Sequence, residues 1–228
     1  MPLLPGPPPV EITLRRSTRA RRFSLRVSQL DGRVTLSMPL RAREAEAMAF
    51  VRDQEGWIRA ALAVVPRLAP VRFGMMLPLE GQMLTLAPAG GRAVQLIGDS
   101  LLVPGAPAQV AARLASFLKA RARDRLAEAS DRHSSALGRR YSSLTLRDTR
   151  SRWGSCTAAG GLMYSWRLIM APAPVLDYVA AHEVAHLDQM NHSPAFWAVV
   201  AGLCPGYQAP RRWLKTKGQA LHGYRFGG

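Results

Sequence analysis

The most constraining feature of this chain is the segment HEVAHLDQMNH at residues 182–192. In an α-helix of 3.6 residues per turn, His182 and His186 lie one turn apart on the same face, so both imidazoles can bind one metal ion. Glu183 lies beside them and can take a proton from water at the metal without being a ligand. The segment therefore predicts a helix that carries a metal site.

His192 is the expected third ligand. Asn191 tolerates the left-handed conformation that commonly ends helices, so we expect this helix to stop near Asn191. Ser193 and Pro194 are typical of the N-cap and first residue of a new helix, which leaves His192 in a short link between two helices. Three neutral imidazoles and an open fourth position favour one zinc ion per chain at a catalytic site.

Two other interpretations of the segment are less favoured. A surface helix with two solvated histidines disagrees with Val184, Ala185 and Leu187, because these residues make the helix largely apolar. Unpartnered histidine and glutamate side chains would be costly to bury on such a helix. A closed structural zinc site would need a fourth protein ligand, usually cysteine, and Cys156 and Cys204 lack the C-x-x-C spacing.

The pattern along the chain predicts an α+β fold. Residues 11–38 alternate as strands, with Asp31-Gly32 as a hairpin turn, and residues 39–62 form a helix closed by Pro66. Further elements are expected as strands at 77–88, 93–105, 141–148 and 161–170, a turn at RWGSC (152–156), a long helix at 107–138 ending at Gly138, and two short C-terminal helices. The expected division is a flexible arm at 1–10, an α+β region at 11–105, and the metal-dependent domain at 106–228.

Three stretches carry a family resemblance: SRWGSC (151–156), WRLIMAP (166–172) and DYVAAHEVAHLDQMNHSPAFW (177–197). They resemble the YgjP-type metallopeptidase domain, a relative of the SprT and WLM zinc-peptidase-like proteins. The resemblance is strong over residues 141–215. It implies a small zincin, in which a β-sheet packs over the HExxH helix. The positions equivalent to His182, His186 and His192 would then hold zinc, with Glu183 as general base.

Members of that family are described as metal-dependent hydrolases or metallopeptidases, and a nucleotide-pyrophosphatase activity is also attached to the family name. We therefore predict a zinc-dependent hydrolase that cleaves peptides or proteins. One alternative is a metal-dependent hydrolase of nucleotide phosphoanhydrides, although three imidazoles suit magnesium poorly and the sequence has no phosphate-binding glycine loop. Another alternative is a nucleic-acid-associated zinc protein or protease.

Other side chains are weaker candidates for the site. Those that could contact the substrate or an oxyanion are Arg152, Tyr164, Tyr207 and His222. Asp177 or Asp188 could orient a ligand imidazole, whereas His133 is expected at the surface rather than as a fourth ligand. The strand Leu162–Ile169 is expected to cross the cleft and to offer an edge to which a peptide can add.

The net charge of +16 raises the question of nucleic-acid binding. The densest basic cluster comprises Arg15, Arg16, Arg19, Arg21, Arg22 and Arg26. Lysine occurs only three times, as in a GC-rich coding sequence, and no aromatic residue beyond Phe23 accompanies the cluster, so a stacking platform is not indicated. Nucleic-acid binding is left open but is not favoured.

The remaining features favour a cytoplasmic enzyme. The N-terminus lacks a basic segment followed by an apolar run, so it indicates neither a signal peptide nor a membrane anchor. Two cysteines far apart in sequence argue against a disulfide framework and fit a reducing compartment. The sequence does not indicate the oligomeric state.

Overall fold

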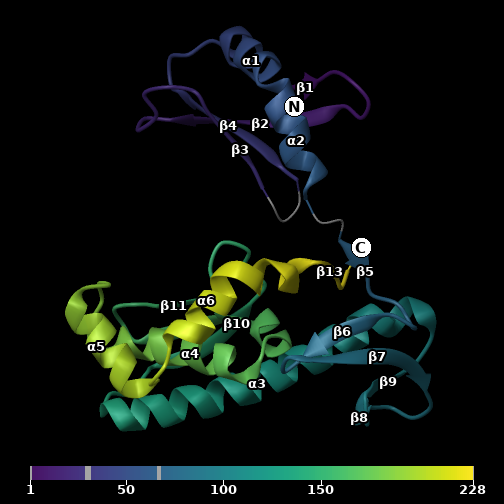
Figure 1. Cartoon of the computed structure of the whole chain (residues 1–228), viewed down its shortest axis with the longest axis vertical. Coiled ribbons are helices and arrows are strands. Elements are labelled where there is room, and N and C mark those ends of the chain that lie inside the picture. Colours follow the sequence, from purple (N-terminus) through teal and green to yellow (C-terminus); the bar gives the residue numbers. More distant parts are fainter. Residues whose placement is uncertain (1, 29–31, 66–67, 228) are drawn as a thin grey trace. The chain divides into compact units, whose positions relative to one another are not determined.

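The computed structural model describes residues 2–28, 32–65 and 68–227, and Figure 1 shows its helices and strands. The chain divides into two compact units, Met1–Leu68 and Ala69–Gly228, which we call the N-terminal and the C-terminal unit. Each unit has its own cluster of buried apolar side chains and combines helices with β-sheet. The predicted α+β class is therefore confirmed.

The N-terminal unit is a four-stranded sheet with two helices packed on one face. In spatial order its strands are β1 (Leu3–Leu4), β2 (Val10–Ser17), β4 (Val34–Pro39) and β3 (Ser24–Val27). Val34, Leu36 and Met38 of β4 are fully buried against helices α1 (Glu44–Asp53) and α2 (Glu55–Ala63). The residues between them are half-buried on the opposite face, because successive strand side chains point to opposite sides of a sheet.

This unit differs from the expectation in two respects. The segment expected as a flexible arm contains β1, and its Leu4 is fully buried and pairs with Val10. The single helix expected at 39–62 is broken at Gln54, which ends α1 and precedes α2. The antiparallel pairing of β3 with β4 agrees with the expected hairpin. Asp31 and Pro66, which were expected in its turn and at the helix end, lie outside the described residues.

The C-terminal unit begins with a second four-stranded sheet that packs on a long helix. In spatial order the strands are β6 (Met76–Leu79), β7 (Gln82–Ala89), β9 (Ser100–Pro104) and β8 (Gln95–Ile97). The helix α3 (Val110–Leu137) ends, as predicted, at Gly138 in the left-handed conformation that glycine adopts without strain. Leu77, Leu101 and Leu114 are fully buried in one cluster. The division between units therefore falls at 68/69 and not at 105/106, because these strands bury their apolar residues against α3.

A three-stranded sheet follows, in the order β10 (Ser143–Arg147), β12 (Gly161–Ser165) and β11 (Gly154–Cys156). The central strand β12 is parallel to β10 and antiparallel to β11. The prediction that Leu162–Ile169 offers a free edge is therefore wrong, because both edges of β12 are paired and the strand ends at Ser165. Residues 154–156, which were expected as part of a turn, form the edge strand β11.

The rest of the unit is mainly helical. Its elements are α4 (Ala173–Ala185), α5 (Pro194–Leu203), α6 (Gln208–Lys217), the short 3₁₀ helices η1 (Pro107–Gln109), η2 (Trp166–Met170) and η3 (Gly218–His222), and the paired strands β5 (Ala69–Pro70) and β13 (Tyr224–Arg225). The two short C-terminal helices that the sequence predicted correspond to α5 and α6. Among the described residues, no helix is both long enough and apolar enough to cross a membrane.

The turn between β6 and β7 fixes the segment that leads into α4. Glu80 and Gly81 both have positive φ angles, of 51° and 85°. The backbone N–H of Glu80 donates to the carbonyl of Ile169 at 2.7 Å. A Cβ atom on Gly81 would lie 2.9 Å from the Cα of Pro172, so only glycine allows this close approach. The turn thereby anchors the chain directly before α4.

Candidate metal centre

Helix α4 carries the first two histidines of the predicted site. Pro172 and Pro174 start the helix, where a missing N–H costs nothing, as the sequence predicted. The helix ends at Ala185, earlier than the expected Asn191, and His186 occupies its C-cap. A tighter turn of the 3₁₀ type follows, in which the N–H of Leu187 donates to the carbonyl of Val184 rather than to that of Glu183.

The link that carries His192 is held by side-chain hydrogen bonds. Asn191 does not adopt the expected left-handed conformation. Instead, its side-chain oxygen accepts the backbone N–H of Ser193 at 3.2 Å. Ser193 is the N-cap of α5, as predicted, and its hydroxyl accepts the N–H of Phe196 at 3.3 Å. These bonds turn the chain so that His192 faces α4.

His182, His186 and His192 come together as the sequence predicted, with one potential ligand atom from each within 4.8 Å of the others. The Nε2 atoms of His182 and His192 are 3.1 Å apart. Two nitrogens bound to a tetrahedral zinc ion lie roughly 3.4 Å apart, so this spacing is close to that of a shared ion. The Nδ1 of His186 lies 2.9 Å from the carbonyl oxygen of Gln189, which leaves its Nε2 for a metal.

The surroundings favour neutral imidazoles, which metal binding requires. Burial lowers the pKa of His182 to about 3, and the neighbouring His186, His192 and Arg211 act in the same direction. Burial also lowers the pKa of His186, against the opposing effect of its hydrogen bond to Gln189. Within the described part of the chain, the buried Nδ1 of His182 has no hydrogen-bond partner. His182 and His186 are thus held in the neutral form that a metal ligand needs.

Glu183 lies in contact with the edge strand of the sheet. Its side chain is buried, and burial raises its pKa to about 8, although the charge of Arg152 opposes the shift. A Cβ atom built on Gly154 of β11 would lie 2.5 Å from Oε1 of Glu183. Glycine at this position therefore lets the carboxyl group lie against the strand. The sequence analysis had assigned Gly154 only to a turn, because the contact joins residues far apart in the chain.

The other predicted contact residues take different positions. Arg152 is exposed and close enough to Glu183 to affect its pKa. Tyr164 is fully buried in the core, where its hydroxyl shares a 3.0 Å hydrogen bond with Ser130, so it is not available to substrate. His222 stacks on Trp153 in a buried position.

Tyr207 belongs to a stack of aromatic rings that reaches the histidines. Its ring stacks on Trp197 and on Tyr178, with centroid distances of 5.4 and 6.2 Å. Trp197 in turn lies 5.8 Å from His182 and carries the guanidinium of Arg211 over its face at 4.3 Å. Trp197 and Arg211 were missed by the sequence analysis. Trp197 could have been found from the sequence, because it lies in the first turn of the helix that follows His192.

Neither predicted aspartate bonds to any of the three clustered imidazoles. Asp177 binds Arg132 and lies 2.9 Å from Nε2 of His133. His133 is buried, so its expected surface position is wrong, and it is not a member of the histidine cluster. Asp188 pairs with Arg139 at the surface. The imidazole of His186 instead contacts the carbonyl oxygen of Gln189, because the early end of α4 turns that oxygen toward it.

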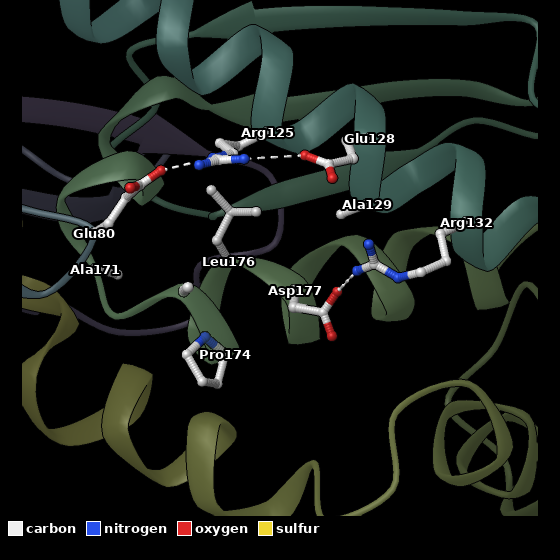
Figure 2. Close-up of a pocket in the computed structure, with 10 residues that line it drawn as sticks. Glu80, Arg125, Glu128, Ala129, Arg132, Ala171, Pro174, Leu176 and Asp177 are labelled. Atoms are coloured by element: carbon white, nitrogen blue, oxygen red, sulfur yellow. Dashed lines mark hydrogen bonds and ion pairs between the residues drawn. The ribbon is translucent and has the colours of Figure 1, made fainter.

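A pocket of about 420 Å³ lies between α3 and the first turns of α4, and none of the clustered histidines lines it (Figure 2). Figure 2 shows that its charged side chains are paired with one another. Arg125 pairs with Glu80 and Glu128, and Arg132 pairs with Asp177. The Arg125–Glu80 pair joins α3 to the turn between β6 and β7, and the Arg132–Asp177 pair joins α3 to α4. The charged groups of this pocket therefore stabilise the packing of α3.

Comparison with known protein families identifies the family of this chain. The family described as YgjP-like, metallopeptidase domain, matches residues 21–217. The chain belongs to the YgjP-like metallopeptidase family. The match extends over most of both units and includes all of α4 and the link to α5. The resemblance inferred from the three sequence stretches is thus confirmed.

Among solved structures, this YgjP-like chain is similar to the metallopeptidase zymogen abylysin of Pyrococcus abyssi. The identity is 19% and the TM-score is 0.36, with 40% of this chain and 95% of that chain covered. The search of curated proteins gave no significant match.

Proposed function

We propose that this YgjP-like protein is a zinc-dependent peptidase in which His182, His186 and His192 hold the metal and Glu183 is the general base. The observation that carries the proposal is the convergence of three imidazoles beside one buried carboxyl group. Three nitrogen ligands leave a fourth tetrahedral position for water, which is the arrangement of catalytic rather than structural zinc. Membership of a metallopeptidase family supports a peptide as the substrate.

The protein residues have separate parts in the reaction. When bound, the metal supplies Lewis-acid polarisation of the scissile carbonyl and acidifies the attacking water. The Glu183 carboxylate accepts the proton of that water and then donates it to the leaving amine nitrogen. A pKa raised to about 8 by burial suits the donating form, while a neighbouring divalent cation favours the ionised, accepting form. The carbonyl of Gln189 holds the imidazole of His186 in one orientation.

We further infer a zincin-like layout in which an extended peptide lies along β11. Among the described strands, β11 pairs only with β12, so the backbone groups on its other edge are available to a peptide strand. Its Gly154 contacts Glu183, which brings this edge next to the proposed base. The half-buried rings of Trp197 and Tyr207 offer an apolar surface beside His182 for a substrate side chain.

The test compares zinc-loaded parent and Glu183→Gln proteins on a peptide library and on nucleoside triphosphates. We expect the parent to cleave peptides, and Glu183→Gln to lose about 10²- to 10⁴-fold in rate, as for removal of a proton-transfer group. Its zinc content should stay that of the parent, because a base is not a ligand. A second variant, His192→Ala, should bind zinc much more weakly than the parent, because it lacks the proposed third ligand.

Each assignment can fail separately. Turnover retained in Glu183→Gln would refute the general base, and zinc lost from it would make Glu183 a ligand. Parental zinc affinity in His192→Ala would remove the third ligand. Hydrolysis of nucleotides without cleavage of any peptide would identify a phosphoanhydride hydrolase instead of a peptidase.

A further inference from the structure

The sheet of the N-terminal unit has a polar face opposite its helices. Arg15 of β2, Ser37 of β4 and Ser24 of β3 are cross-strand neighbours in register. They alternate with the buried residues of these strands, so their side chains lie on the face away from α1 and α2. Arg26 and Thr35 are the next pair along the same face. The face therefore combines guanidinium and hydroxyl groups.

A pocket of about 680 Å³ opens on this face where β2 ends and the chain returns to β3. The residues that line it are Arg15, Ser17, Arg19, Ala20, Arg21, Arg22, Ser24 and Ser37. The fold thus gathers four of the six arginines of the basic sequence cluster, together with three hydroxyl groups. Its lining residues come from the strands β2, β3 and β4 and from the loop that joins β2 to β3.

The arginines of this pocket have no counter-charge within the described residues. No carboxylate lines the pocket, and Arg15, Arg19, Arg21 and Arg22 are all exposed and form no ion pair there. Arg16 differs, because its guanidinium donates to the carbonyls of Leu40 and Ala42 at 2.6 and 2.9 Å. Arg16 is therefore held by the fold, whereas the four pocket arginines are free to bind an anion.

We propose that this arginine pocket binds the phosphate backbone of a nucleic acid. Planar guanidinium groups donate paired hydrogen bonds to phosphate oxygens, and serine hydroxyls add single donors. The pocket is far larger than one phosphate group, and its four arginines suit several phosphates along a chain. The whole N-terminal unit is also basic, with twelve arginines and six acidic residues in 1–68.

The pocket lacks the groups that would bind bases or lipids. No aromatic side chain lines it, and the nearby Phe23 stacks on Phe50 of α1 at 5.6 Å, on the core side of the sheet. Bases therefore have no stacking partner, and the binding is independent of sequence. A membrane-binding surface would combine basic residues with exposed apolar ones, whereas Ala20 is the only apolar residue among those that line the pocket.

The experiment measures binding of the full chain to single-stranded oligonucleotides of about 20 nucleotides as salt rises from about 50 to 200 mM. The pocket variant changes Arg15, Arg19, Arg21 and Arg22 to Gln. The control variant removes the same charge by changing Arg41, Arg52, Arg92 and Arg123 to Gln, which are exposed and do not line the pocket. Zinc content and circular dichroism verify that both proteins are folded.

We expect the slope of log affinity against log salt to fall by about 3 in the pocket variant, since each phosphate contact on a single strand contributes roughly 0.7. The control should keep the parental slope, and peptide cleavage should be unchanged in both. Equal losses in the two variants would overturn the proposal, because only overall charge would then matter. Binding to phosphatidylserine vesicles without binding to oligonucleotides would overturn it in favour of a membrane surface.

If the quadruple variant does not fold, the single variants Arg21→Gln and Arg22→Gln take its place. Each should lower the slope by about 0.7, compared with no change for Arg41→Gln. An unchanged slope in both would overturn the proposal.

Discussion

Gly154 lets the side chain of Glu183 take its position, because glycine has no side chain of its own to fill that space. The carboxyl group is buried against β11, and a methyl group at position 154 would lie 2.5 Å from Oε1 and 2.6 Å from Cγ. Both distances are far below ordinary van der Waals contact. The buried Glu183 cannot move aside as the end of an exposed side chain could. The position of the proposed base on α4 therefore depends on a glycine of the neighbouring strand β11.

We predict that Gly154→Ala displaces the Glu183 carboxyl group and lowers peptide cleavage by about 10²-fold, which a misplacement of about 1 Å can cause. Zinc affinity should stay close to that of the parent, because the three atoms nearest to the added methyl group all belong to Glu183 and none to an imidazole. Gly202→Ala is the matched control, since a Cβ there meets nothing within 4 Å. Measured rates and zinc contents decide the matter. Parental activity in Gly154→Ala would show that the close contact has no role in catalysis.

At the scale of elements, α3 and α4 are joined by the contact of a buried histidine with a half-buried aspartate. His133 of α3 is 4% exposed, and its Nε2 lies 2.9 Å from Oδ1 of Asp177 in α4. Arg132 of α3 binds the same carboxylate. Burial raises the pKa of Asp177, but the bonds to His133 and Arg132 outweigh this effect and hold the pKa below that of an ordinary aspartate. The pair fixes the helix that carries the proposed base and two proposed ligands.

We predict that Asp177→Asn lowers the free energy of unfolding at pH 7 by about 1–3 kcal/mol, the usual cost of losing hydrogen bonds to a charged group. A carboxylate with a lowered pKa stabilises the fold fully above its unfolded pKa and loses this effect as the pH falls through the folded value. The difference between parent and variant should therefore shrink below about pH 4. Urea unfolding at several pH values measures it.

The control for this prediction is Asp124→Asn, which changes an exposed carboxylate of α3 that does not bind α4. Its stability should follow that of the parent at every pH. A difference between parent and Asp177→Asn that stayed constant from pH 7 to strong acid would argue against the ionised pair as its cause.

At the scale of the whole molecule, the two units have separate cores and separate candidate functions. The residues of one buried cluster belong to the segment from Val71 to Leu221, and those of the other belong to the segment from Leu4 to Ile58. The clustered histidines and Glu183 belong to the first region, and the arginine pocket belongs to the second. Because each core is formed within its own unit, neither proposed site depends on residues of the other unit.

We predict that the fragment 69–228 folds and binds one zinc ion with the affinity of the full chain. It should not bind oligonucleotides, because it lacks the arginine pocket. Metal titration, thermal unfolding with and without zinc, and the salt-dependent binding assay measure these properties. Zinc should raise the unfolding temperature of the fragment, since a ligand that binds only the folded state stabilises it. A fragment that is unfolded at all zinc concentrations would refute the independence of the two units.

The sequence by itself determined the features that depend on neighbours along the chain. The gathering of His182, His186 and His192 follows from helical spacing and from the cap at Ser193, and both act within a few residues. The end of α3 at Gly138 is equally local, because glycine alone adopts the required backbone conformation freely. The family resemblance rested on contiguous stretches of the same kind.

Only the tertiary structure decided which distant segments meet. It put β12 in the middle of its sheet, Tyr164 in the core, and Gly154 against Glu183. It also joined the strands at 76–104 to α3 and turned a run of arginines into a pocket beside the serines of β3 and β4. The physical reason is that strand pairing and core packing join residues far apart in sequence, and the residue pattern of a strand leaves its partner unspecified.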